Sequence, residues 1–96
     1  MKIRVSHRAR ADLEEIWRYS SRHWGEEHAD LYTDLLVMRF AWLTENRGLW
    51  RDRSDLGPSL FTYTEKSHVI YFMHSTACLK IVRLLHLSMD PELRLK

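Results

Sequence analysis

The chain has 96 residues and a formal net charge of +2, from fifteen Lys and Arg against thirteen Asp and Glu. This length suits one domain with a modest core, and this charge is too small to indicate nucleic acid as the main partner. Cys78 is the only cysteine, which excludes an internal disulfide and fits a reducing cytoplasm. No apolar run approaches the length of a membrane span, so we expect a cytoplasmic protein that does not contact membranes.

The charges are unevenly distributed along the chain. Acidic residues are concentrated in residues 12–15 and 26–34, whereas residues 1–10 and 80–96 are mainly basic. This pattern predicts an acidic helical side and a basic end, the latter open to nucleic acid or to an acidic partner.

The first predicted elements are a short strand and an amphipathic helix. Residues 1–5 alternate in type and include Ile3 and Val5, as a strand does. Ser6 is the predicted N-cap of a helix over residues 7–23. Its apolar stripe, at about 100° per residue, comprises Ala9, Leu13, Ile16, Trp17, Ser20 and Trp24. Asp12, Glu14 and Glu15 lie outside this stripe and are expected to be solvated.

A second helix is predicted over residues 26–46, after a turn at Gly25 that makes an antiparallel helical hairpin. It has two adjoining apolar stripes, more than one-sided packing requires. The first stripe comprises Ala29, Tyr32, Leu36, Phe40 and Leu43, and the second comprises Leu31, Leu35, Met38 and Trp42. Either both stripes pack within the domain, or a partner chain covers the second stripe. Within the second stripe, Trp42 is expected to belong to the core.

Three strand-like runs follow a polar surface loop at residues 49–59. They cover residues 60–64, 68–74 and 78–87, and the short turns between them predict an antiparallel meander. The last two runs are apolar on both faces, so one face of the sheet needs cover from the tail, a dimer or a bound segment. The whole chain, residues 1–96, is predicted to be a single α+β domain of order β-α-α-β-β-β, with the hairpin packed on a small antiparallel sheet.

The sequence offers little for catalysis or metal binding. His68 and His74 share a strand face but lie roughly 20 Å apart, and no other histidine has ligand spacing, so we expect neither a metal nor a cofactor. The chain has no Gly-x-Ser-x-Gly motif and no glycine-rich phosphate loop. The remaining catalytic option is a ribonuclease that uses Arg83, His86 and Tyr71 on the sheet.

Three stretches carry a family resemblance. ARADLEEIWRYSSRHWGEEHADLYTDLL (9–36), SHVIYFM (67–73) and IVRLLHLSMD (81–90) together resemble the ParE toxins of the RelE/ParE superfamily. The resemblance implies a helical hairpin laid on an antiparallel sheet. It also implies a small cytoplasmic toxin of a type II toxin–antitoxin pair, active in plasmid stabilisation, neutralised by a ParD-like antitoxin and directed at DNA gyrase. Operator DNA is expected to be contacted only through the antitoxin.

The sequence departs from the common ParE pattern at three positions. Phe61, Met73 and Ser88 stand where Arg is frequent in the family. Because an Arg fork stabilises developing anionic charge, these departures disfavour phosphodiester cleavage. We therefore predict a toxin that acts by binding and is not an enzyme. The alternatives are a RelE-like ribosome-dependent mRNA endoribonuclease that uses Arg83 and His86, or a degenerate, non-toxic antitoxin-binding module.

Two sets of contact residues are predicted. The target-binding set, at the basic end of the chain, is Arg83, His86, Met89, Arg94 and Lys96. The antitoxin-binding set, which takes in the second helical stripe and one strand residue, is Leu31, Leu35, Met38, Trp42 and Phe72.

Overall fold

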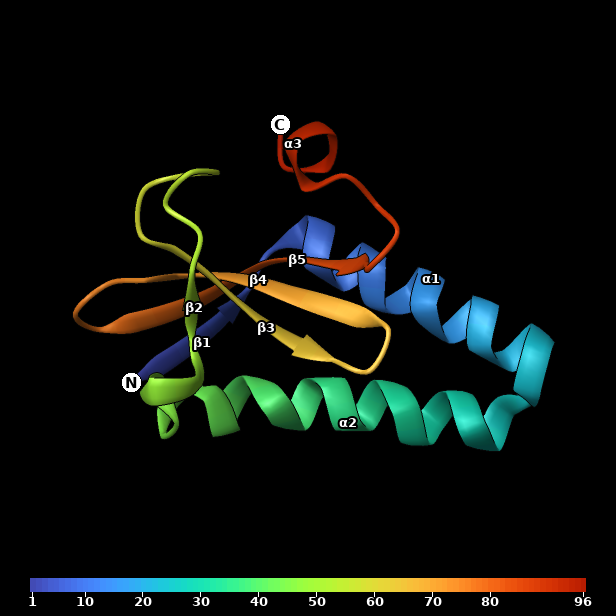
Figure 1. The fold of residues 1–96 in the computed structure, drawn as a ribbon. Helices are drawn as coiled ribbons and strands as arrows, with labels where there is room; N and C mark the ends of the chain where they lie inside the picture. Colours follow the sequence, from blue (N-terminus) through green and yellow to red (C-terminus); the bar gives the residue numbers. More distant parts are fainter.

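The structure is a computed structural model that describes residues 1–96. A helical hairpin covers one face of a five-stranded sheet (Figure 1). The α+β class and the predicted element order are confirmed, with a 3-10 helix, a two-residue strand and a C-terminal helical turn in addition. The elements are β1 (Lys2–Val5), α1 (His7–Trp24), α2 (Glu26–Thr44), η1 (Arg47–Leu49), β2 (Arg51–Asp52), β3 (Leu60–Glu65), β4 (His68–His74), β5 (Cys78–His86) and α3 (Pro91–Arg94).

The sheet has the strand order β1-β5-β4-β3-β2. β3, β4 and β5 form the predicted antiparallel meander. β1, in contrast, pairs in parallel with β5, with Lys2 opposite Cys78 and Val5 opposite Ile81. The sheet is therefore mixed rather than purely antiparallel. Parallel neighbours need a long connection, and everything between β1 and β5 in the sequence supplies it.

The two ends of α1 follow from local chemistry. Ser6 is the N-cap, as predicted: its Oγ accepts a hydrogen bond from the Ala9 amide at 3.0 Å. The same hydroxyl donates to the Val82 carbonyl at 2.8 Å, which fixes the start of α1 to β5. At the other end Gly25 has a φ of 90°, a conformation that favours glycine, and turns the chain into α2.

The core lies between the hairpin and the sheet. The first predicted stripe of α2 is buried at every position. All of this stripe except Ala29 belongs to a cluster of eleven buried residues, which are Ala9, Ile16, Tyr32, Leu36, Phe40, Leu43, Ile70, Phe72, Leu79, Ile81 and Leu84. Trp24, predicted to lie on the buried stripe of α1, is instead 60% exposed, because the tip of the hairpin projects beyond the sheet (Figure 1).

The opposite face of the sheet has a smaller apolar cluster of Leu60, Tyr71 and Leu85. Two segments supply its cover: Leu56 from the loop before β3, and Leu95 from the C-terminal tail. α3 lies on the side of the sheet away from α2 (Figure 1). The tail thus covers part of the face that the sequence left open. The segment expected to be only a loop also contains β2, because two of its residues pair with β3.

Candidate partner-binding sites

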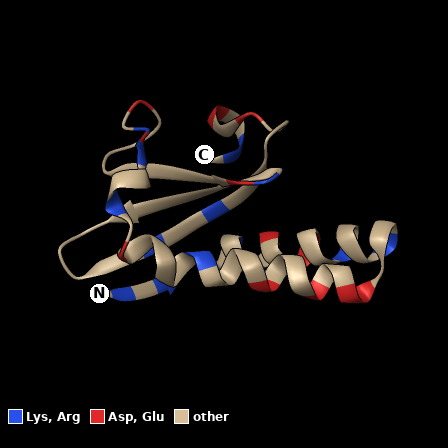
Figure 2. Cartoon of the chain, turned by 60° about the horizontal axis from the view of Figure 1, so that its bottom comes forward, with Lys and Arg blue, Asp and Glu red and all other residues tan.

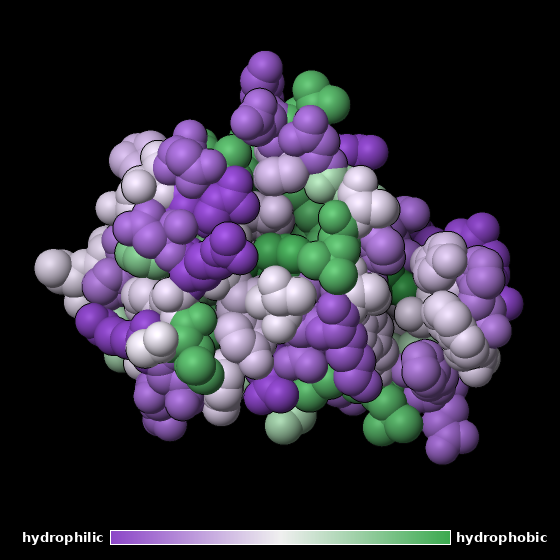
Figure 3. All heavy atoms as spheres, viewed as in Figure 1, coloured by the Kyte–Doolittle hydropathy of each residue, from purple (hydrophilic) through white to green (hydrophobic).

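One exposed apolar feature is a line of side chains on α2, here called the α2 ridge, which consists of Leu31, Leu35 and Met38. Leu31 is 66% exposed and Met38 is 68% exposed, while Leu35 is half-buried. Their spacing of four and three residues places them on one side of the helix. Figure 3 shows hydrophobic side chains among hydrophilic ones along the lower edge of the molecule, over α2. Contiguous exposed apolar side chains of this kind mark interaction sites.

Carboxylates lie beside the ridge. Glu27 and Asp34 each precede a ridge residue by four positions, so they lie one turn away on the same side of α2. Both are exposed, and neither takes part in an ion pair within the chain. Figure 2 shows acidic residues along the hairpin, towards the end away from the N-terminus. The ridge is therefore apolar with an acidic border.

Trp42 continues the ridge but is largely held by the domain itself. It is half-buried and packs against the main core, with its ring 5.1 Å from that of Tyr63. The guanidinium of Arg39 lies 4.6 Å from the Trp42 ring centre. Arg39 also pairs with Glu65, and that hydrogen bond raises the pKa of the guanidinium. Trp42 therefore belongs mainly to the core, as the sequence analysis assigned it.

Phe72 is a correction to the predicted antitoxin-binding set. Its side chain has no exposed surface and lies in the main core, with ring centroids 5.2 Å from Trp50 and 6.2 Å from Phe61. β4 is apolar on both faces, and alternation alone does not say which face a helix will cover. A partner cannot reach Phe72 while the domain is folded.

Arg83 is a correction to the predicted target-binding set. Its Nε and Nη2 donate to the two carboxylate oxygens of Asp12 at 2.7 and 2.9 Å. Its Nη1 donates to the Arg94 carbonyl at 2.6 Å. The hydrogen bond to Asp12 raises the pKa of Arg83. Asp12, expected to be solvated, is buried with it, so this guanidinium fixes α1 and the tail to the sheet and does not face a target.

His86 and Met89, two further members of that set, line one hollow of about 640 Å³ at the end of the sheet nearest the hairpin tip. The His86 Nδ1 accepts from the Ser88 amide at 3.1 Å, so the neutral ring carries its proton on Nε2. His68 lies beside it, with ring centroids 5.3 Å apart. Burial, followed by the neighbouring His86, lowers the pKa of His68 to about 4. The Tyr32 hydroxyl lies 2.6 Å from Nδ1 of the neutral His68 ring.

Arg94 and Lys96 are exposed on the tail, but their backbones are anchored. Arg8 donates to the carbonyls of both residues, at 2.8 and 3.0 Å. The predicted target set is thus divided between the hollow and the tail. The sequence analysis did not predict that His68 lies beside His86. The two histidines stand on adjacent strands of the predicted meander, and this spacing could have indicated that they are neighbours.

The residues of the ribonuclease alternative do not form one accessible site. Tyr71 lies directly opposite Arg83 in the β4–β5 ladder, but Arg83 is engaged by Asp12 and the tail, and His86 lines the hollow. Tyr71 is buried in the small cluster on the opposite face, where burial raises the pKa of its hydroxyl. Phe61 packs on Trp50, Met73 lies partly exposed on the open face, and Ser88 bonds His86.

No group of three or more His, Cys, Asp or Glu side chains is placed to hold a metal ion. None of the helices is both long and apolar enough to span a membrane.

This arrangement has known relatives. A family model described as the ParE toxin of the type II toxin–antitoxin system parDE matches residues 3–91. The chain belongs to the ParE toxin family. It is 33% identical over 92 residues to Toxin ParE1 of Caulobacter vibrioides, covering 96% of this chain and 95% of that protein. It is 32% identical over 88 residues to Toxin ParE of Escherichia coli, covering 91% and 85%.

A solved structure shares the fold of this ParE-family chain. It comes from the chromosomal ParDE TA system from P. aeruginosa, with a TM-score of 0.78 and 20% sequence identity, covering 92% of this chain and 97% of that one. The protein is therefore a ParE-type toxin of a toxin–antitoxin system, with the hairpin-on-sheet fold that the sequence predicted.

Proposed function

We propose that this ParE-family toxin is neutralised by a ParD-type antitoxin that covers the α2 ridge, and that the free toxin acts by binding DNA gyrase. The observation that carries the proposal is the exposure of Leu31 and Met38 on a helix whose other apolar stripe is fully buried. We place the protein in the cytoplasm, where both partners act, and operator DNA would be contacted only through the antitoxin.

The ridge also indicates the chemistry of the antitoxin segment. An amphipathic helix could lay its apolar face on Leu31, Leu35 and Met38. The apolar surface that it buries would stabilise the complex by about 25 cal/mol per Å². Glu27 and Asp34 border the ridge without a partner in the chain. Basic residues beside the apolar face of the antitoxin helix would complete the match.

Two observations favour binding over catalysis. Arg83 already bonds Asp12 and the tail, and its ladder partner Tyr71 is buried in the small apolar cluster. With Arg83 engaged, the strands that carry Tyr71 and His86 have no free Arg fork to stabilise a pentavalent phosphate. The surface left for gyrase comprises His86 and Met89 at the hollow and Arg94 and Lys96 on the tail. The choice of gyrase as target rests on the family.

The test uses the antitoxin encoded beside this chain. The double variant Leu31→Glu/Met38→Glu should weaken the complex by about a hundredfold or more, roughly 2.7 kcal/mol, while thermal unfolding of the free toxin stays almost unchanged. Val37→Glu is the matched control, because Val37 is 49% exposed on the same helix but turned away from the ridge. If the double variant binds the antitoxin as tightly as the control does, the antitoxin does not cover the ridge.

A further inference from the structure

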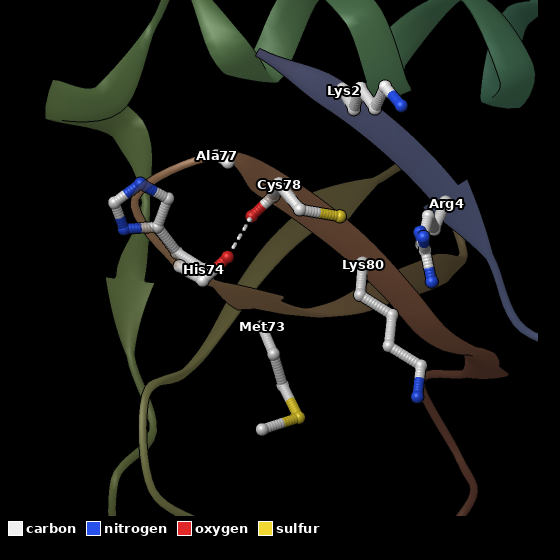
Figure 4. Close-up of a pocket in the computed structure, with 8 residues that line it drawn as sticks. Lys2, Arg4, Met73, His74, Ala77, Cys78 and Lys80 are labelled. Carbon is white, nitrogen blue, oxygen red and sulfur yellow. Dashed lines mark hydrogen bonds between the residues drawn. The ribbon is translucent and has the colours of Figure 1, made fainter.

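A second surface feature is a basic hollow of about 430 Å³ at the β1 edge of the sheet, lined by Lys2 and Arg4 of β1, Lys80 of β5 and Met73 of β4. Figure 4 shows the three cationic side chains along one side of this hollow and Met73 on another. Because Val5 and Ile81 pack into the main core, alternation places the three cations on the face away from the helices.

The three cations lack partners within the chain. All three are exposed, none takes part in an ion pair, and no carboxylate lines the hollow. Arg4 lies directly opposite Lys80 in the ladder, a strand spacing of about 4.8 Å, and Lys2 lies two residues along, at about 7 Å. Like charges this close repel one another, so an anionic occupant would bind here favourably.

The backbone beside the hollow is also unpaired. The Lys2 amide donates to the Ala77 carbonyl and the Ser6 amide to the Ile81 carbonyl. In a parallel ladder alternate residues face the neighbouring strand, so Lys2, Arg4 and Ser6 bond to β5. The amides and carbonyls of Ile3 and Val5 point the other way, and β1 has no second neighbour in the sheet.

We propose that an extended acidic segment of a partner protein adds to the sheet as a further strand beside β1. Its backbone pairs with Ile3 and Val5, and its carboxylates lie over Lys2, Arg4 and Lys80. The alternate side chains of that strand lie next to Ile3, which is 37% exposed on the helix side, so they are apolar. This site shares no residue with the α2 ridge.

The hollow fits a peptide better than a nucleic acid. Single-stranded nucleic acids bind through bases stacked on aromatic side chains as well as through phosphates. The one ring among the lining residues belongs to His74, and it packs against Trp50, at a centroid distance of 5.2 Å, in contact with the core. The free edge of β1, in contrast, offers hydrogen-bonding groups that only another peptide strand matches in spacing.

The test uses the full chain and a fluorescein-labelled peptide in which Glu and Val alternate, followed by fluorescence anisotropy. Lys80→Glu and Lys2→Glu should each weaken binding about tenfold or more, whereas Arg22→Glu, at the far end of α1, should leave it unchanged. Ile3→Pro removes the outward amide of β1 together with the isoleucine side chain beside the added strand, and it should weaken binding similarly while the protein stays folded. If that variant does not fold, hydrogen exchange on the unaltered chain decides: the peptide should slow exchange about tenfold at Ile3 and Val5.

Four results would overturn this inference. One is equal binding of a peptide in which Lys replaces Glu. The second is unchanged binding of the Glu-Val peptide by Lys80→Glu. The third is a lack of protection of the Ile3 and Val5 amides under saturating peptide. The fourth is displacement of the peptide by an oligothymidylate that binds more tightly, which would assign the hollow to single-stranded nucleic acid.

Discussion

Arg83 on β5 and Asp12 on α1 form a bidentate ion pair across 71 positions of sequence, with both side chains largely buried. The Asp12 carboxylate also accepts the Leu84 amide at 2.9 Å. This one carboxylate therefore fixes the first helix to the central sheet. Removing it leaves Nε and Nη2 of the buried guanidinium, and the Leu84 amide, without their acceptor, although Nη1 keeps the Arg94 carbonyl.

The first prediction follows from that pair. Asp12→Ala should lower the free energy of unfolding by about 3 to 5 kcal/mol, since an uncompensated buried charge remains. Glu14→Ala is the control, because Glu14 pairs only with Arg18 at the surface, and it should cost less than about 0.5 kcal/mol. Urea denaturation measures both. Equal midpoints for the two variants would mean that the pair does not hold α1 in solution.

The second prediction separates Trp42 from the rest of the antitoxin-binding set. Trp42→Glu should destabilise the free toxin by roughly 3 kcal/mol, because the ring packs on Tyr63 and the core. Leu31→Glu should change the urea midpoint little, because Leu31 is exposed. If Trp42→Glu keeps its stability and loses only antitoxin binding, the ring belongs to the interface and the core assignment is wrong.

The third prediction concerns pH. The folded-state pKa of His68 is lowered to about 4, below the ordinary value of 6.5. The unfolded chain therefore binds a proton that the folded chain excludes, so this contribution to stability is complete above pH 6.5 and is lost as the pH falls towards 4. Between pH 6.5 and about 4 the free energy of unfolding falls by up to about 1.4 kcal/mol for each pH unit.

His68→Asn tests this dependence, since it leaves an acceptor near the Tyr32 hydroxyl and removes the titrating group. Guanidinium denaturation at several pH values between 4.5 and 7.5 should show a smaller loss of stability for the variant than for the unaltered chain. Parallel pH curves for the two proteins would show that His68 is not excluded from protonation in the folded state.

The fourth prediction is about the tail. From the sequence alone, removing residues 92–96 should cost no more than about 1 kcal/mol, because the tail lacks apolar periodicity. Leu95 packs on the small cluster. The Arg94 carbonyl accepts from Arg8 and Arg83, and the Lys96 carbonyl accepts from Arg8. These contacts raise the expected cost to about 2 kcal/mol.

Growth arrest by this truncation should fall much further than its stability, while antitoxin binding persists. Melting temperature, antitoxin binding and growth arrest are measured on the same truncated protein, with Leu93→Ala as the control because Leu93 is 69% exposed. Full toxicity in the truncated protein would remove the tail from the target-binding surface.

The sequence predicted best what depends on local pattern. Helical periodicity identified the buried stripe of α2, and Ser6 and Gly25 were identified as the start and turn of the hairpin. What it missed depends on contacts between distant segments. The parallel pairing of β1 with β5 and the Asp12–Arg83 pair join residues more than 70 positions apart, and no local pattern encodes them.

The prediction that Phe72 contacts the antitoxin was wrong for a different reason. When a strand is apolar on both faces, alternation gives two equivalent sets of side chains and does not say which one the helices cover.

The basic hollow was not predicted from the sequence because Lys2, Arg4 and Lys80 come together only through the parallel pairing of β1 with β5. Had β1 been placed beside β5, the three cations would have stood out on one face.

We propose that the free chain inhibits gyrase by binding and that an antitoxin on the α2 ridge relieves this inhibition. The most direct measurement is ATP-dependent supercoiling of relaxed plasmid by purified gyrase, titrated with the chain and then with the antitoxin. We predict inhibition by the chain, with relief when stoichiometric antitoxin is added. The Leu31→Glu/Met38→Glu variant should not be relieved. Gyrase that stays fully active at saturating toxin, while ribosome-bound transcripts are cleaved, would contradict the account in favour of an endoribonuclease.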